Sequence, residues 1–243
     1  MDDERPHRFS EGQGFDEEYE EFSLDPPELS VDPSEVDPVD SRVLTDMLDE
    51  RNVASDQVDA EQLVDVGLSY MGINRFEEAT ETFERAASFA DDELVAQEAW
   101  VNKGAAHAQL EEYDEAVGAY EEALSIDEDS EHAASAHTNL AYTLWEWGRT
   151  EQALNHAERA VEVDPRFAQA WYNRGFFLAE RGLHENAVDC FDNAIRLGMR
   201  NASVLEEKAR ALEELGENEE AERVQEQAAE LREEAERELV EDR

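Results

Sequence analysis

The residues that most often carry catalysis or bind metals are few and scattered in this sequence. Cys190 is the single cysteine, and the six histidines are His7, His107, His132, His137, His156 and His184. The spacings of histidine and paired cysteine that are typical of zinc sites are absent. Acidic residues occur throughout, so no carboxylate pair stands out. We therefore predict no catalytic residue, no metal site and no cofactor, and we interpret Cys190 as a buried structural thiol.

Two kinds of polar side chain recur at regular spacing instead. The first is an asparagine series at intervals of 37 and 34 residues: Asn102, Asn139 and Asn173. An amide side chain offers a donor and an acceptor, so such a row could pair with the backbone of an extended peptide. The alternative is that these amides are simply solvated.

A basic series shares one position of the same repeat: Lys103, Arg174 and Lys208. It could bind an acidic peptide or a carboxylate. We favour the interpretation in which the aliphatic stems pack and the charged heads reach nearby glutamates.

The charge of the chain limits its partners. Asp and Glu total 65 against 20 Lys and Arg, which gives a formal net charge of -45. Nucleic acids and anionic membranes would be repelled, because both require clustered basic residues. The acidity could serve basic partners, but its even spread and the near absence of lysine favour a comparison with proteins of halophilic archaea. Molar salt would screen such self-repulsion, since the Debye length is then only about 3 Å.

Targeting and membrane signals are also missing from the sequence. The N-terminal residues are acidic and lack an apolar core, so they do not resemble a secretory signal. No apolar run is long enough to span a bilayer. By elimination we expect a cytoplasmic protein.

Three parts follow one another along the chain. Residues 1–40 hold five of the six prolines and many acids, which predicts an acidic disordered tail. Residues 41–56 are expected to form a leading helix and a linker. From residue 57 to about 240, internal repetition governs the pattern.

The repetition is seen in three series of small residues with the same intervals of 37, 37, 34 and 34. They are Gly67, Gly104, Ala141, Gly175 and Ala209; Ala79, Ala116, Ala153, Ala187 and Ala221; and Ala86, Ala123, Ala160, Ala194 and Ala228. Turn residues follow the same register at Asn74, Gly148, Gly182 and Gly216, whereas Glu111 breaks the rule. The pattern predicts helix pairs that bury their apolar stripes only by stacking.

The segment AQAWYNRGFFLAERGLHENAVDCFDNAIRLG resembles a tetratricopeptide repeat almost position by position. The resemblance implies an all-α, right-handed superhelical solenoid of about five helix pairs with a C-terminal capping helix. We expect repeats near residues 60–93, 97–130, 134–167, 168–201 and 202–235. Two repeats carry three extra residues, which we expect in the loops near Ala90 and Asp129.

The resemblance also implies that the first helices line a concave groove that binds peptides. Groove residues are then expected at Val101, Asn102, Thr138, Asn139, Tyr142, Trp145, Tyr172, Asn173 and Phe176. The predicted function is a non-catalytic adaptor or scaffold that binds a peptide or helix of a partner protein. The alternative is a structural module that self-associates through its end repeats or its C-terminal helix.

Overall fold

The computed structural model describes residues 59–241, and side chains as far as residue 237. This range consists of ten helices joined by turns and short loops. The first helices of the pairs are α2 (Ala60–Gly72), α4 (Glu93–Gln109), α6 (Glu131–Glu146), α8 (Ala168–Glu180) and α10 (Ala202–Glu214). The second helices are α3 (Phe76–Phe89), α5 (Tyr113–Ile126), α7 (Thr150–Val163), α9 (His184–Arg196) and α11 (Asn218–Glu241).

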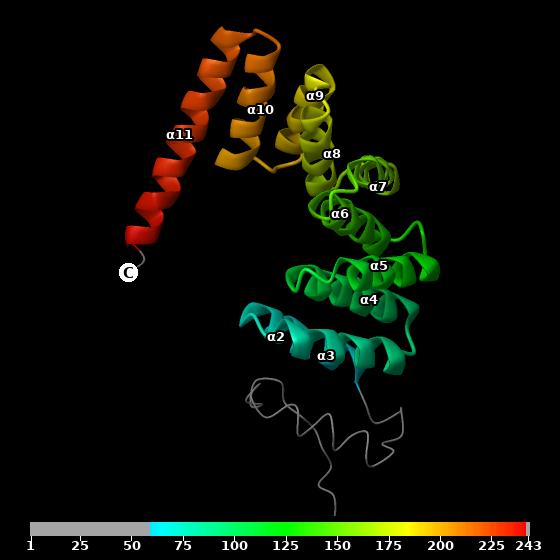
Figure 1. Cartoon of the computed structure of the whole chain (residues 1–243). Coiled ribbons are helices and arrows are strands. Elements are labelled where there is room, and N and C mark those ends of the chain that lie inside the picture. The colour runs from blue at the N-terminus through cyan, green and yellow to red at the C-terminus, as the bar shows by residue number, and fades with distance from the viewer. Residues whose placement is uncertain (1–58, 242–243) are drawn as a thin grey trace, which may run out of the picture. The chain divides into compact units, whose positions relative to one another are not determined.

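Each helix packs against its pair partner, and each of the first four pairs also packs against the next pair along the chain (Figure 1). The predicted fold class, an all-α superhelical solenoid of about five helix pairs, is therefore confirmed. The predicted tail at residues 1–40, and the leading helix and linker at residues 41–56, lie outside the described residues.

All five turns between paired helices have the same geometry. In the third pair, the Arg149 amide donates to the Leu144 carbonyl at 2.7 Å and the Gly148 amide to the Trp145 carbonyl at 2.9 Å. This is a Schellman cap, which places one residue in the left-handed region. That residue has a φ of 83° at Gly148, and Glu111 takes the same conformation with a φ of 61°. The backbone geometry is thus kept where the sequence lacks the usual glycine.

The small residue of each first helix faces the second helix of its own pair. A Cβ atom added to Gly104 would lie 2.6 Å from the Tyr120 ring, and one added to Gly67 would lie 2.4 Å from the Phe83 ring. Ala141 replaces glycine in the third pair, where Ala157 stands at the register position of the rings. Glycine therefore occurs where an aromatic ring needs the space, and alanine is accommodated where no ring is present.

The two alanine series of the second helices form the core of the stack. All ten residues are at most 1% exposed: Ala79, Ala86, Ala116, Ala123, Ala153, Ala160, Ala187, Ala194, Ala221 and Ala228. Alanine leaves little side chain between helix axes, so neighbouring pairs approach closely. The assignment of these series to buried helix faces is confirmed.

The three extra residues of two repeats lie in helices, so the expectation that they lie in loops near Ala90 and Asp129 is wrong. Helices α4 and α6 contain 17 and 16 residues, whereas α2, α8 and α10 contain 13 each. The loops 90–92 and 127–130 are no longer than the loops 164–167 and 197–201. The added residues of α4 are residues 93–96, and Gln97 follows them directly.

Gln97 is fully buried and joins three segments. Its amide nitrogen donates to the carbonyls of Ala123 at 2.9 Å and Asp127 at 2.6 Å. Its amide oxygen accepts from the hydroxyl of Ser130 at 2.6 Å, and Ser130 is also the N-cap of α6. Gln97 therefore ties the end of α5 to the start of α6.

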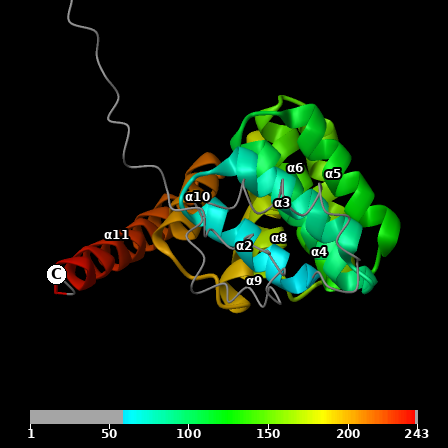
Figure 2. The ribbon, with the colours of Figure 1, turned by 90° about the horizontal axis from the view of Figure 1, so that it is seen from below.

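Helix α11 ends the described stack and has one buried face. Ala221, Val224 and Ala228 pack on α10, whereas the charged residues between them are exposed. With 24 residues it runs on beyond α10, as Figures 1 and 2 show. A polar outer face is the expected property of a helix that closes a solenoid.

Candidate functional site

The nine predicted groove residues divide into a buried group and a partly exposed group. Val101 is 6% exposed, Thr138 1% and Asn173 5%, so the prediction that these three face a ligand is wrong. Val101 belongs to the central apolar cluster. The Thr138 hydroxyl donates to the Ala134 carbonyl of its own helix at 2.7 Å.

Asn173 is buried because it connects two repeats. Its amide nitrogen donates to the Thr138 carbonyl at 3.2 Å, and its oxygen accepts from the Gln169 amide at 2.8 Å. The bond to Thr138 crosses from α8 to α6. A position that the sequence marked for ligand binding thus serves the stacking of the third and fourth pairs.

The remaining two asparagines differ from Asn173. Asn102 and Asn139 are partly exposed, and neither side chain makes a hydrogen bond within residues 59–237. They lie on successive first helices, α4 and α6. Their donors and acceptors are therefore available to a ligand.

Four aromatic residues form what we call the aromatic face: Tyr142 and Trp145 on α6, and Tyr172 and Phe176 on α8. Trp145 lies 5.8 Å from Tyr142 and 5.0 Å from Phe176 between ring centroids, and the second pair meets edge to face. Tyr142 is 46% exposed and the other three are partly exposed. Such geometry is favourable among aromatic rings, and part of each ring remains accessible.

Acidic side chains border the aromatic face. Burial raises the pKa of Tyr142, and the charge of Glu146 and a hydrogen bond with it raise the pKa further. Burial also raises the pKa of Tyr172, with Glu207 adding to the effect and Arg210 opposing it. Glu207 lies 3.0 Å from Arg210 as an ion pair.

Glu207 itself shows how acidic this border is. Burial raises its pKa, Arg210 lowers it, and the nearby charges of Glu180 and Glu206 raise it again. Glu146 of α6 thus acts on Tyr142 and Glu207 of α10 on Tyr172, while Glu180 of α8 lies near enough to Glu207 to raise its pKa. This grouping could not be predicted from the sequence, because glutamates are common everywhere in the chain.

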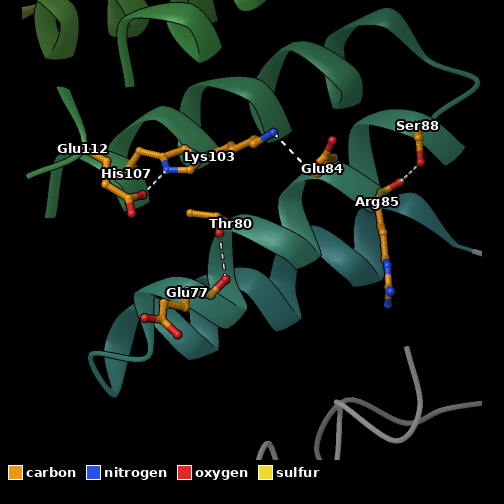
Figure 3. Close-up of polar contacts among 8 residues, drawn as sticks. All are labelled: Glu77, Thr80, Glu84, Arg85, Ser88, Lys103, His107 and Glu112. Atoms are coloured by element: carbon orange, nitrogen blue, oxygen red, sulfur yellow. Dashed lines mark hydrogen bonds and ion pairs between the residues drawn. The ribbon is translucent and has the colours of Figure 1, made fainter. Parts of the chain in front are cut away.

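The basic series lies between repeats. Lys103 on α4 reaches Glu84 on α3 at 3.2 Å, as Figure 3 shows. In the same way Arg174 lies 3.9 Å from Glu158, and Lys208 2.6 Å from Asp192. Lys103 and Arg174 also lie over Trp100 and Trp171. The interpretation that the heads reach nearby acidic residues is confirmed.

One pair of titratable residues was not expected from the sequence. The Nδ1 atoms of His137 on α6 and His156 on α7 lie 3.0 Å apart. Burial lowers the pKa of His137 to about 4, and the charges of His156 and Arg159 act in the same direction. Within the described part of the chain, no three His, Cys, Asp or Glu residues gather as metal ligands.

Cys190 is buried as predicted. Its thiol lies 3.7 Å from an Arg174 nitrogen, and burial raises its pKa in spite of that neighbour. A protonated, inaccessible thiol is a poor nucleophile.

These features define a class of protein: a stack of helix pairs with one partly exposed aromatic face on its middle first helices. Sequence profiles of the tetratricopeptide repeat match residues 95–166, 138–202 and 202–236. Together they cover more than half of the chain, which belongs to the tetratricopeptide repeat family.

Solved structures of similar fold share little sequence with this chain. MamA has a TM-score of 0.59 at 18% identity, over 70% of this chain and 96% of its own. The pilF protein of Pseudomonas aeruginosa has a TM-score of 0.63 at 21% identity, over 70% and 75%. YrrB, described as a TPR protein with an unusual peptide-binding site, has a TM-score of 0.54 at 21% identity, over 77% and 91%. These likenesses support the fold alone.

A shorter sequence match occurs in an uncharacterized protein of Methanocaldococcus jannaschii. It is 36% identical over 44 residues, which are 18% of this chain. The match spans about half the length of that relative. In the described range, none of the helices is apolar over a stretch that could cross a membrane.

Proposed function

We propose that this chain is a non-catalytic adaptor or scaffold that binds a peptide or helix of a partner protein across its middle first helices. The carrying observation is the aromatic face of Tyr142, Trp145, Tyr172 and Phe176. Partly exposed aromatic residues are the commonest anchors of protein interfaces. Family membership supports the same kind of function, since tetratricopeptide repeats typically mediate protein–protein interaction.

Asn139 supports a mode of binding for this partner. Its free amide lies on α6, which also carries Tyr142 and Trp145. An amide beside aromatic anchors can pair with the backbone of an extended segment whatever its side chains are. We therefore extend the proposed contact to Asn102 and Asn139 and leave out Val101, Thr138 and Asn173.

Self-association through the C-terminal helix has less support. The exposed residues of α11 include Glu222, Arg223 and Glu226, and a charged surface of this kind makes a poor dimer seam. The proposal therefore assigns α11 to closing the stack.

The acidity belongs to a second part of the proposal, that the adaptor works in a high-salt cytoplasm. A net charge of -45 on 243 residues repels itself strongly at low ionic strength. Salt in the molar range would remove most of that repulsion.

A photocrosslinking pair tests the adaptor function. Benzoylphenylalanine replaces Tyr142 in one protein and Leu183 in another, because the two native side chains are both 46% exposed. In extract from the native cell, we expect a partner to crosslink from position 142 and not from position 183. The double variant Asn139→Ala and Tyr172→Ala should weaken that crosslink.

Three outcomes would count against the proposal. Equal crosslinking from both positions indicates nonspecific adhesion, and no crosslink at all removes the support for a binding face. A crosslink to a second copy of the chain favours self-association instead.

A further inference from the structure

The aromatic face is suited to a positive charge. Aromatic rings carry negative charge on their faces, and they attract a guanidinium or ammonium group within about 6 Å. Trp145 is the strongest ring of this kind, and Tyr142 and Phe176 flank it at 5.8 and 5.0 Å. The most exposed of the four residues, Tyr142, opens one side of this group to solvent.

The border of the face carries unbalanced negative charge. Glu146 and Glu180 are exposed, and neither has a cationic partner within residues 59–237. Glu207 is largely buried and has one cation, Arg210, at 3.0 Å. An acidic ligand would add to this repulsion, whereas a basic one would reduce it.

Arg210 also shows that a guanidinium can lie at the edge of the aromatic face, beside Tyr172. It stands in the register of Tyr142 and Phe176, one repeat further on. Its charge opposes the rise in the pKa of Tyr172, so it acts on the edge of the aromatic face. The side chain of Arg210 is 60% exposed. It lies on α10, and α8 separates it from the rings on α6.

Among the first helices that the structure describes, no other repeats this combination of rings at one register. At the register of Tyr142 and Trp145, α2 has Leu68 and Met71, and α4 has Ala105 and Ala108. Among the described first helices, aromatic rings therefore occupy this register only on α6 and α8.

We propose that the aromatic face recognises a basic segment of a partner protein by placing a Lys or Arg side chain over Trp145, between the carboxylates of Glu146 and Glu180. This inference rests on the proposed adaptor function and adds the chemistry of the partner. The negative field of the whole chain draws a basic segment in. The face then holds one of its cations by contacts with rings and carboxylates.

The test compares two probes on the full chain. One is a short alanine-based peptide that carries arginines, and the other is the same peptide with neutral citrulline in their place. The readout is the fluorine NMR signal of Trp145 in 5-fluorotryptophan protein, assigned with Trp145→Phe, at one fixed KCl concentration. We expect the arginine peptide to bind about tenfold more tightly than the citrulline peptide.

Two matched triple variants locate the effect, since each removes three negative charges. The first changes glutamates at the aromatic face: Glu146→Gln, Glu180→Gln and Glu207→Gln. The second changes exposed glutamates on α11: Glu222→Gln, Glu226→Gln and Glu230→Gln. The first should reduce the preference for arginine to less than about twofold, and the second should preserve it.

The failures can be told apart. If both peptides shift the Trp145 signal with equal affinity, the face binds peptides without regard to charge, so the adaptor function stands and this inference fails. If both triple variants lose the preference equally, it comes from the net charge of the chain and the inference is overturned. If neither peptide shifts Trp145, the inference is also overturned, while the crosslinking pair still decides the adaptor function.

Discussion

A substitution of glycine by alanine should have opposite effects at two positions of this chain. Gly104 lies on α4 against Tyr120, where an added Cβ would come within 2.6 Å of a ring carbon. Gly118 lies on α5, and an added Cβ would meet nothing within 4 Å. The chemical change is the same, so the difference between the two variants isolates the close approach of the paired helices.

The expected magnitudes follow from two opposing effects. Alanine inside a helix is more stable than glycine by about 0.5–1 kcal/mol, so Gly118→Ala should raise the free energy of unfolding by that amount. Gly104→Ala has the same gain, but overpacking of a tight core costs about 1–3 kcal/mol. We therefore expect Gly104→Ala to be less stable than Gly118→Ala by about 1–3 kcal/mol.

Urea unfolding followed by circular dichroism measures both free energies of unfolding, at a single KCl concentration in the molar range. A second pair is made in the Tyr120→Leu background, where the ring is gone. There Gly104→Ala should become neutral or stabilising, because the loss of Tyr120 itself cancels between the two members of that pair. The third repeat supports this expectation, since Ala141 is accommodated opposite Ala157.

Equal stabilisation by Gly104→Ala and Gly118→Ala in the parent chain would refute the reasoning. So would an equal loss of stability by Gly104→Ala with and without the Tyr120 ring. Either result would mean that the small-residue register is not set by the rings of the second helices.

Four further predictions concern the stability of the fold. Glu111→Gly should stabilise the fold by about 0.5–1 kcal/mol, because Glu111 holds a φ of 61°; unchanged stability would contradict this. Asn173→Ala should cost about 1–3 kcal/mol, because it removes the hydrogen bond to the Thr138 carbonyl and leaves the Gln169 amide without its acceptor, whereas Asn139→Ala should stay within about 0.5 kcal/mol. His137 has a pKa of about 4 in the fold against 6.5 when unfolded. The unfolded state therefore binds the extra proton first, and stability falls as the pH drops from about 6.5 to 4; His137→Gln should flatten this part of the profile relative to the parent chain. Finally, the melting temperature should rise steeply between 0.1 M and 2 M KCl in a thermal scan, and an equal melting temperature would contradict the high-salt proposal.

The repeat register could be predicted because it depends on local spacing alone. Small residues at fixed intervals determine which faces meet, and the buried alanine series agree with that prediction. The placement of the extra residues could not be predicted in this way. Local spacing does not reveal long-range contacts such as those of Gln97 next to the added residues of α4, whose three hydrogen bonds reach residues 26 to 33 positions away.

The candidate site was predicted only in part for a similar reason. The asparagine series looks uniform in the sequence, yet Asn173 is buried while Asn102 and Asn139 are partly exposed. The distinction arises from the Thr138 carbonyl of the preceding repeat, which a single helix does not reveal. The His137–His156 pair was missed because its members lie on different helices of one pair.

The polar contacts between repeats differ from one junction to the next, and this has a consequence for assembly of the stack. At three junctions between successive helix pairs, a cation pairs with an acid. At the junction of the second and third pairs, Leu140 stands at the position of the cation. There Gln97 makes the polar contact instead, with Ser130. Near-identical repeats risk docking on the wrong neighbour during folding. Here a pair docked out of order next to α4 would leave the buried amide oxygen of Gln97 without the Ser130 hydroxyl, which costs about 1–3 kcal/mol. The three cation–acid contacts are alike and do not distinguish their repeats, so the order of the stack is specified most strongly at the junction of the second and third pairs.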